Sequence, residues 1–248
     1  MKQAIVMAAL RAAFCLWLAT LPALAGAGSF QVTPIRLEFS AQQRTAAVTV
    51  RNDSPESLVI QIELMDWTQR ESQDVYTETG DLLATPPIVT VPAGRDQVFR
   101  VGLRRAPDPT RELSYRVFLR EIVPPPAKDF TGLQVSLRVG VPAFVKPIAP
   151  AGRPELAWSA RIAPDGRLSV TARNAGNMHV QVVDFRVNVP GTEAAIANTD
   201  QMSYVLADQT REWQLELKNA LPAGTTRLHL MAQTDAGPIE AELALDSR

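Results

Sequence analysis

The stretch Thr131–Pro147, TGLQVSLRVGVPAFVKP, decides the fold class of this chain. Hydrophobic side chains occupy every second position in it, at Leu133, Val135, Leu137, Val139 and Val141. A period of two is the geometry of a β-strand, whose successive side chains point to opposite faces. Because strands usually have about 5–6 residues, the run is long. It predicts one long strand with a single hydrophobic row, which either packs on its own domain or is lent to a partner.

Short alternating runs of the same kind precede this stretch, separated by turn signals at intervals typical of a β-sandwich. The strands expected there are Ser29–Phe39, Ala46–Val50, Leu58–Trp67, Ala84–Val91, Gln97–Leu103 and Leu113–Ile122, with a short one around Val75-Tyr76. Pro34 lies inside the first strand. Since proline cannot donate to a β-ladder, this strand is expected at a sheet edge or to change sheets at Pro34.

After the long strand, Pro147–Pro154 (PIAPAGRP) has the composition of an interdomain hinge. The alternating pattern then restarts, in Ala157–Ile162, Leu168–Arg173, Val180–Val189, Met202–Leu206, Glu212–Leu217, Arg227–Met231 and Ile239–Leu245. No stretch has the pattern of an amphipathic helix. The sequence therefore predicts an all-β protein with two domains in tandem, 26–147 and 148–248.

The N-terminal residues 1–25 have the pattern of a secretory signal peptide. A basic start leads into the apolar stretch Ala12–Leu21, and Ala23–Ala25 forms a small-x-small cleavage site, with cleavage after Ala27 as the alternative. The apolar part is too short to span a bilayer. Cys15 is the only cysteine, so the mature chain would have no disulfide and would depend on its hydrophobic core. We expect an exported protein that is not inserted in a membrane.

The residue inventory argues against catalysis and against nucleic acid. Without the two basic residues of the signal segment, 25 − 2 leaves 23 basic against 26 acidic residues, a formal charge of −3. Such a balance is unsuited to a polyanionic partner. His179 and His229 are the only histidines, and neither lies in a metal-ligand pattern, so each is interpreted as structural. No nucleophile elbow or phosphate-binding loop is present. The sequence predicts no enzyme, metal or cofactor.

Taken in order, four segments resemble the periplasmic chaperones of chaperone–usher pilus assembly, the PapD-like family. They are QVTPIRLEF at 31–39, TPPIVTVPAGRDQVFRVGL at 85–103, YRVFLREIVPPP at 115–126 and LQVSLRVGV at 133–141. Arg173-Asn174 and TDAG at 234–237 also fit. The resemblance implies two immunoglobulin-like β-sandwich domains in an L or boomerang arrangement. It also implies partners: pilus subunits that lack their last strand, and an outer-membrane usher that receives the complex.

In the family, the chaperone completes the subunit's sandwich with its own long strand. The resemblance implies that the donor row is Leu133, Val135, Leu137 and Val139, with Val141 as a candidate fifth member. The alternative is that these side chains only pack the chain's own domain.

Family members also hold the subunit's C-terminal carboxylate with two basic residues, and the first of them matches Arg36. An arginine fork suits a carboxylate because it donates two parallel hydrogen bonds. The second is usually a lysine, five positions before the proline that ends the long strand. In this sequence the strand ends at Pro147, and the position of the lysine is taken by Pro142. Arg116 is the favoured substitute and Arg138 the other candidate. Arg116 could instead lie on a solvent-exposed face.

The resemblance further implies a network between the two domains, formed by a glutamate, a basic residue and an aspartate. Glu112, Lys146 and Asp235 match these positions, with lysine in place of the usual arginine. Lysine keeps the charge but loses the planar fork, so the network would be looser or paired differently.

Other classes of function remain as alternatives. One is an adhesive or structural two-domain module of the cell surface, and another is a secreted hydrolase on a β-sandwich. Within the chaperone family, the short loop Pro124–Thr131 and the wording LRVGVPAFV favour the archaic type, which assembles spore-coat-protein-U-like pili. Because exposed hydrophobic rows are seldom left uncovered, the free protein is also expected to cap itself by dimerisation.

Overall fold

The computed structural model describes residues 30–125, 131–149 and 152–246, and the predicted signal peptide 1–25 lies outside these ranges. Every regular element in the described ranges is a β-strand, which confirms the all-β prediction. None of these residues forms a helix with the length and apolar character needed to cross a bilayer.

The first ten strands form two facing sheets. Their bounds are β1 (Phe30–Thr33), β2 (Leu37–Phe39), β3 (Thr45–Asn52), β4 (Leu58–Arg70), β5 (Gln73–Glu78), β6 (Leu82–Thr85), β7 (Ile88–Val91), β8 (Asp96–Leu103), β9 (Leu113–Glu121) and β10 (Arg138–Val145). One sheet has the order β1-β3-β8-β6, and the other has the order β2-β10-β9-β4-β5 with β7 added beside β4. Alternate side chains of both sheets, such as Val48, Phe99 and Val117, meet in one buried core, as in a β-sandwich.

Pro34 marks a change of sheet, and β1 and β2 on its two sides are each at a sheet edge, so both alternatives given by the sequence apply. Residues before it belong to β1, which pairs with β3, whereas those after it belong to β2, which runs parallel to β10 in the facing sheet. The expected single strand Ala84–Val91 is likewise divided by its proline pair, because β6 pairs with β8 and β7 pairs with β4. Both positions follow from the missing N–H of proline, which interrupts a ladder.

The last eight strands build a second core. Their bounds are β11 (Leu156–Ile162), β12 (Leu168–Asn174), β13 (Val180–Asn188), β14 (Ala195–Thr199), β15 (Ser203–Val205), β16 (Thr210–Leu215), β17 (Arg227–Thr234) and β18 (Gly237–Asp246). They follow the order β14-β13-β17-β18-β11-β12-β16, with β15 beside β13. Leu168, Phe185 and Leu230 are among the fully buried side chains. The strand β14 is absent from the sequence-based prediction.

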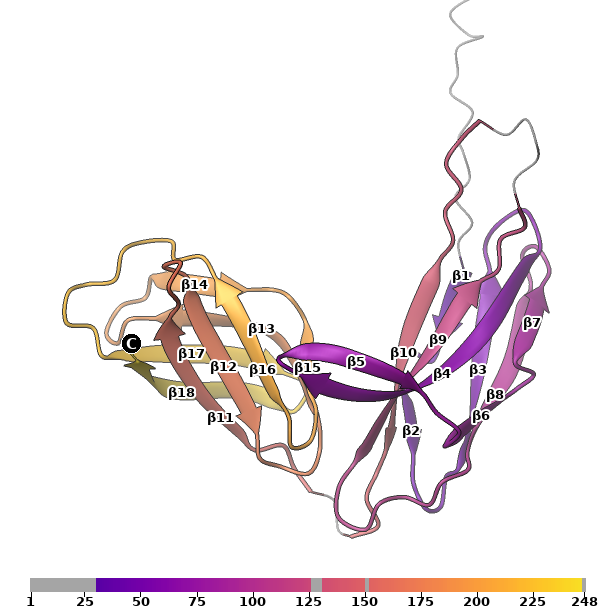
Figure 1. Ribbon diagram of the computed structural model, residues 1–248, viewed down its shortest axis with the longest axis horizontal. Coiled ribbons are helices and arrows are strands. Elements are labelled where there is room, and N and C mark those ends of the chain that lie inside the picture. Colours follow the sequence, from indigo (N-terminus) through magenta and orange to yellow (C-terminus); the bar gives the residue numbers. More distant parts are fainter. Residues whose placement is uncertain (1–29, 126–130, 150–151, 247–248) are drawn as a thin grey trace, which may run out of the picture.

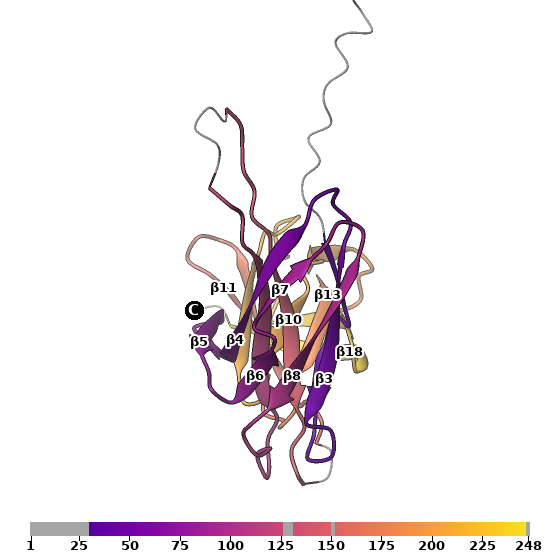
Figure 2. The ribbon, with the colours of Figure 1, turned by 90° about the vertical axis from the view of Figure 1, so that its right-hand side faces the viewer.

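The two halves meet at an angle and give an L-shaped outline (Figure 1). The hairpin β4–β5 reaches from the first half to the second, beside β15. Seen from the side, the chain on both sides of residues 126–130 projects beyond the end of the first sandwich (Figure 2). The junction and the projection are therefore the two special features of an otherwise regular pair of sandwiches.

The predicted long strand is wrong at its start. Residues 131–137 are extended but carry no strand pairing, and the paired strand begins at Arg138. The physical reason lies in the neighbour: β9 ends at Glu121, and prolines at 124 and 125 follow it. Without a partner backbone, the continuation of β10 has nothing to pair with inside its own sheet.

Each half contains a buried asparagine at the end of a corresponding strand, Asn52 on β3 and Asn174 on β12. The Asn174 amide donates to the carbonyls of Met178, Val205 and Leu206 and accepts two backbone N–H groups. In the first half, Asn52 donates to the carbonyls of Glu56 and Val91 and accepts the Ser54 backbone N–H. These side chains satisfy loop backbone groups that would otherwise be buried unpaired.

Replacement of Asn174 by alanine is expected to destabilise the second half by about 2–5 kcal/mol, because several buried backbone groups lose their partner at once. Chemical denaturation of the variant would measure the loss. Asn198→Ala is the matched control, since Asn198 is exposed on β14 and its substitution should leave stability within about 0.5 kcal/mol. Equal stability of the two variants would contradict this role.

Candidate functional site

One hydrophobic row runs along β10 and continues past the end of its sandwich. Toward the end of the strand, Val141, Ala143 and Val145 are buried in the first core. Leu137 and Val139 are half-buried, and beyond them Val135 is 55% and Leu133 86% exposed. Val141 is only 3% exposed, so the suggestion that it is a fifth donor residue is wrong: its side chain is already packed in the core of its own sandwich.

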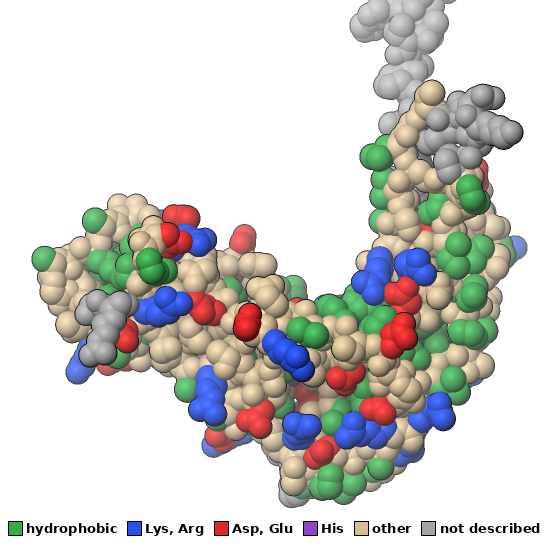
Figure 3. Space-filling model, viewed as in Figure 1, with side chains coloured by type: hydrophobic (Ala, Val, Ile, Leu, Met, Phe, Trp, Pro, Cys, Tyr) green, Lys and Arg blue, Asp and Glu red, His purple; other side chains and the backbone are tan. Residues whose placement is uncertain are grey.

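The projecting segment makes its backbone hydrogen bond at its base, and farther out the Gln134 amide donates to the Pro124 carbonyl at 3.0 Å. The Glu121 N–H donates to the Leu137 carbonyl at 2.9 Å, and the Ser136 hydroxyl donates to the Glu121 carbonyl at 2.8 Å. Residues 131–136 are exposed and show no ladder within the described part of the chain. Figure 3 shows hydrophobic side chains along this projection and charged ones below it. An extended backbone with free N–H and C=O groups and a hydrophobic row is a template for another strand.

The charged group at the base of the projection contains Arg138, the second candidate for carboxylate binding. Its Nε and Nη2 donate to Glu63 Oε2 at 3.1 and 2.8 Å, and its guanidinium lies 3.6 Å from the centre of the Phe118 ring. Arg120 contacts the same glutamate at 2.6 Å. Arg138 is therefore engaged within its own sheet.

Gly140 leaves room for side chains of the neighbouring strand. A Cβ placed there would lie 2.8 Å from Phe118 Cε1 and 3.2 Å from Arg116 Nε, closer than side-chain carbons tolerate. The missing side chain thus allows Phe118 and Arg116 to cover β10.

We expect Gly140→Ala to destabilise the first half by about 1–3 kcal/mol, because the Phe118 ring must move away from its packed position. Thermal unfolding would report this as a lower Tm. The control is Gly102→Ala on β8, where the added Cβ would meet its nearest atom at 3.9 Å, an ordinary contact. A Tm for the Gly140 variant as high as that of the control would refute the packing argument.

Arg36 lies at the junction of the two halves and contacts the second half with one nitrogen. Its Nη2 donates to Gln181 Oε1 at 2.9 Å, to the Tyr204 hydroxyl at 3.4 Å and to Asp235 Oδ2 at 3.1 Å. Burial acts to lower the pKa of the guanidinium, but the hydrogen bonds and charges of Tyr204 and Asp235 outweigh it and raise that pKa. Arg36 also lines a hollow of about 390 Å³ with Pro34, Leu37, Glu38 and residues 43 and 45–47.

Arg116, the favoured second anchor, stands opposite Pro142 in the β9–β10 ladder. It is half-buried, its guanidinium lies 4.6 Å from the centre of the Trp67 ring, and its Nε is buried with no hydrogen-bond partner in the described ranges. Arg36 lies about 6 Å from the rings of Phe144 and Tyr204, which pack around the same tryptophan. The two arginines therefore border one aromatic cluster, defined by Trp67, Phe144 and Tyr204.

The interdomain network differs from the expected trio in its basic member. Lys146 pairs with Glu38 at 2.7 Å, within the first half. The parallel register of β2 and β10 sets Glu38 opposite Phe144, and Lys146 follows two positions later, within reach of the glutamate. The hydrogen bond from Lys146 lowers the pKa of Glu38. Lys146 thus takes no described part in the predicted network with Glu112 and Asp235 and is paired differently, the alternative that a lysine at this position suggested.

His179 takes the central place, which the sequence did not indicate. The buried Glu112 accepts hydrogen bonds from the His179 backbone N–H at 3.0 Å and contacts its Nδ1 at 2.6 Å. The Nε2 of the same ring lies 3.9 Å from Asp235 Oδ2, and the ring stacks on Phe144 at 3.5 Å. A histidine thus links the glutamate and the aspartate, in place of a basic side chain from the long strand.

A second contact between the halves comes from the β4–β5 hairpin. Gln69 donates to the Tyr204 carbonyl at 2.8 Å and accepts from the Leu206 N–H at 3.1 Å. Asp74 accepts from Arg211 at 3.2 Å and from the Trp67 indole at 3.1 Å. The hairpin therefore fixes both the second half and the tryptophan beside Arg116.

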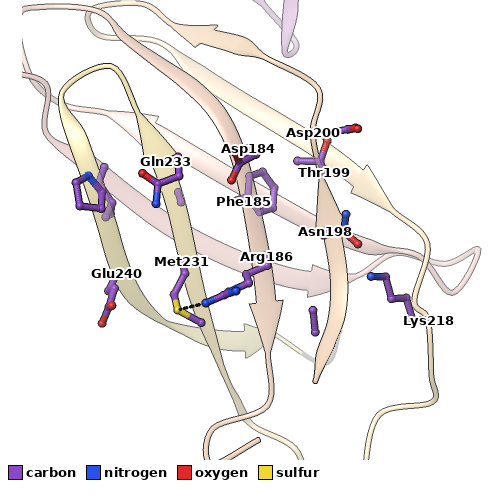
Figure 4. A pocket seen from close by; sticks show the side chains of 14 residues that line it. Asp184, Phe185, Arg186, Asn198, Thr199, Asp200, Lys218, Met231, Gln233 and Glu240 are labelled. Atoms are coloured by element: carbon purple, nitrogen blue, oxygen red, sulfur yellow. Dashed lines mark hydrogen bonds between the residues drawn. The ribbon is translucent and has the colours of Figure 1, made fainter. Parts of the chain in front are cut away.

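One further hollow is lined by none of the predicted site residues. A hollow of about 630 Å³ lies on the outer face of β14, β13, β17 and β18, lined by charges of both signs such as Asp184, Arg186 and Lys218 (Figure 4). Arg186 points there to the sulfur of Met231. Among the described side chains, no group of histidines, cysteines and carboxylates has the arrangement of a metal site.

Residues 29–151 match the family model described as pili and flagellar-assembly chaperone, PapD N-terminal domain. The chain is 26% identical to the chaperone protein PapD of Escherichia coli over 127 residues, which cover 50% of this chain and 51% of PapD. The match thus spans about half the length of that relative.

Similar solved structures cover more of the chain. One belongs to the CsuC–CsuE chaperone-tip adhesion subunit complex from archaic chaperone-usher Csu pili of Acinetobacter baumannii: its TM-score is 0.64 at 20% identity, over 88% of this chain and 100% of that chain. The E. coli chaperone DraB has a TM-score of 0.56 at 20% identity, over 86% and 98% of the two chains. These likenesses show the fold, two immunoglobulin-like β-sandwiches in an L. The chain belongs to the PapD-like family of pilus-assembly chaperones, which is not a family of enzymes.

Proposed function

We propose that this protein is a periplasmic chaperone that binds pilus subunits by donor-strand complementation and delivers them to an outer-membrane usher. The observation that carries the proposal is the hydrophobic row that leaves its own sandwich, with Leu133 and Val135 exposed on an unpaired, extended backbone. Such a row is costly in water unless a partner covers it.

The donor segment consists of Leu133, Val135, Leu137 and Val139. Their side chains would fill successive pockets in a subunit that lacks one strand, while the free backbone groups of 131–136 pair with the subunit's strands. The same alternation that places Val141 in the chaperone's own core would place the donor side chains, farther along the projection, in the core of the subunit.

Arg36 and Arg116 are the proposed anchors of the subunit's C-terminal carboxylate. Both flank the aromatic cluster at the junction, where partial burial strengthens an ion pair relative to open water. A fixed carboxylate would set the register of the subunit strand on the donor segment, since a shift of one residue would turn the hydrophobic row away from its pockets.

The remaining assignments rest on the family and on the sequence pattern. Residues 1–25 are the proposed export signal, and 26–147 and 148–248 the proposed domains. The similarity to an archaic Csu-type complex supports the archaic subclass.

Self-capping by dimerisation of the free protein through the donor segment is proposed too, and sedimentation of a monomer at high concentration would contradict it.

Co-purification tests the proposed function. The tagged chain would be expressed in a bacterial periplasm together with the pilin-like subunits encoded nearby, and captured through its tag. We expect one subunit to be retained in equimolar amount and to be degraded or aggregated when the chain is absent. Expression of the same subunits with a tagged periplasmic protein of another fold is the control. If no subunit is retained, the adhesive-module alternative takes precedence.

A further inference from the structure

The contacts of Arg36 are confined to one side of its guanidinium. All three hydrogen bonds use Nη2, and all three acceptors, on Gln181, Tyr204 and Asp235, come from the second sandwich. For Nη1 and Nε, no hydrogen bond to a described residue is present. The side chain is 30% exposed, and the residue borders the 390 Å³ hollow. Arg36 is thus fixed at one nitrogen, and its other donors have no partner in the part of the chain that the structure describes.

The Asp235 carboxylate that holds Arg36 is itself fixed by its own half. Its Oδ1 accepts the Gln181 backbone N–H at 2.8 Å, and the Asp235 N–H donates to the Gln181 carbonyl at 3.0 Å. The adjacent turn is closed by Thr234, whose hydroxyl donates to the Gly237 carbonyl at 2.6 Å. A carboxylate tied in this way cannot swing aside at low cost when another anion arrives.

Two roles for Asp235 are conceivable, and they predict opposite effects. As an internal substitute for the subunit's carboxylate, Asp235 would compete for Arg36, and its removal would strengthen binding. As a support, it would keep the arginine in one rotamer, and its removal would weaken binding, since a free arginine side chain loses rotamer entropy when it is ordered by its ligand. The single-nitrogen contact and the fixed turn favour the second role.

We propose that Asp235, assisted by Gln181 and Tyr204, is a positioning residue: it holds Nη2 of Arg36 so that Nη1 is presented to the C-terminal carboxylate of the subunit. The inference rests on the proposed function. It assigns to the second sandwich a part in carboxylate recognition through an arginine of the first. Carboxylate anchoring then requires that the two halves be docked.

The test compares the subunit captured by co-purification in two forms, with its native C-terminal carboxylate and as the C-terminal amide. The wild-type chain is expected to prefer the carboxylate. Asp235→Asn keeps the shape and the Oδ1 acceptor but removes the charge, and should reduce this preference about tenfold, the loss of one charge-assisted hydrogen bond. Affinity for the amide should stay unchanged, whereas a merely structural defect would weaken both forms equally.

Asp184→Asn is the matched control, because Asp184 is an exposed aspartate on β13 outside the junction. Tyr204→Phe, which removes only the 3.4 Å bond and keeps the ring, should lower the preference by a smaller factor and covers the case that Asp235→Asn misfolds. An unchanged or increased preference in the folded variants would overturn the positioning role. That result leaves the proposed function intact, whereas failure of both subunit forms to bind the wild type would refute the function itself.

Discussion

Replacement of both Val135 and Leu137 by glutamate is expected to abolish capture of a subunit and to leave the chaperone folded. Neither side chain belongs to a buried core, since Val135 is 55% exposed and Leu137 half-buried. In the complex, each would bury a hydrophobic side chain, which contributes about 1.5–3 kcal/mol. The loss of both, together with the cost of placing two charges in apolar pockets, corresponds to a fall in affinity of about a thousandfold or more.

Pull-down and calorimetry would measure this effect, and circular dichroism would verify the fold. Glutamate at both Leu83 and Val98 is the matched control, because these side chains are 53% and 42% exposed on the opposite sheet. This control should capture the subunit as the wild type does. Retention of the subunit by the Val135/Leu137 variant would mean that the projecting row has no role in binding.

The second large effect is expected from Arg36→Ala, which should weaken subunit binding by about 2–5 kcal/mol, because a partly buried carboxylate loses its partner. Arg36→Lys should recover part of the loss, since lysine keeps the charge but not the planar fork. Titration calorimetry with the purified subunit would give both values. Arg51→Ala, which removes an arginine with a 52% exposed side chain in the same sandwich, serves as control.

Arg36 also bridges the halves, so its removal could alter the angle between them. Small-angle X-ray scattering of the free variants would detect such a change. Equal affinity of wild type and Arg36→Ala would contradict the anchoring role, whereas a loss confined to the carboxylate form of the subunit would support it.

Features that depend on local chemistry could be predicted from the sequence. The alternation from Leu133 onward predicted a hydrophobic row, because a period of two is a property of the strand itself. Pro34 predicted a sheet edge or a change of sheet for the same kind of reason, since its missing N–H prevents a ladder hydrogen bond wherever it lies.

Features that depend on distant partners could not be predicted from the sequence. The strand β10 begins at Arg138 because β9 ends at Glu121, and no pattern within 131–147 contains that information. Lys146 occupies the expected position in sequence, but the β2–β10 register gives it Glu38 as a partner.

His179 was interpreted as an ordinary structural histidine, because its partner Glu112 lies 67 residues away and belongs to the other half. Gln69 and Asp74 likewise gain their roles only when the β4–β5 hairpin reaches the second half. Interdomain contacts of this kind arise from tertiary packing. A resemblance can indicate which positions take part in them, but not which side chains pair.

Hydrogen–deuterium exchange of the backbone amides of Gly132–Ser136 tests donor-strand complementation most directly. In the free protein these amides have no ladder partner among the described residues and should exchange within seconds, whereas in the chaperone–subunit complex they should be protected as strongly as those of β9. Fast exchange of this segment in a complex that holds an equimolar subunit would contradict the account, since the subunit would then be bound by another surface.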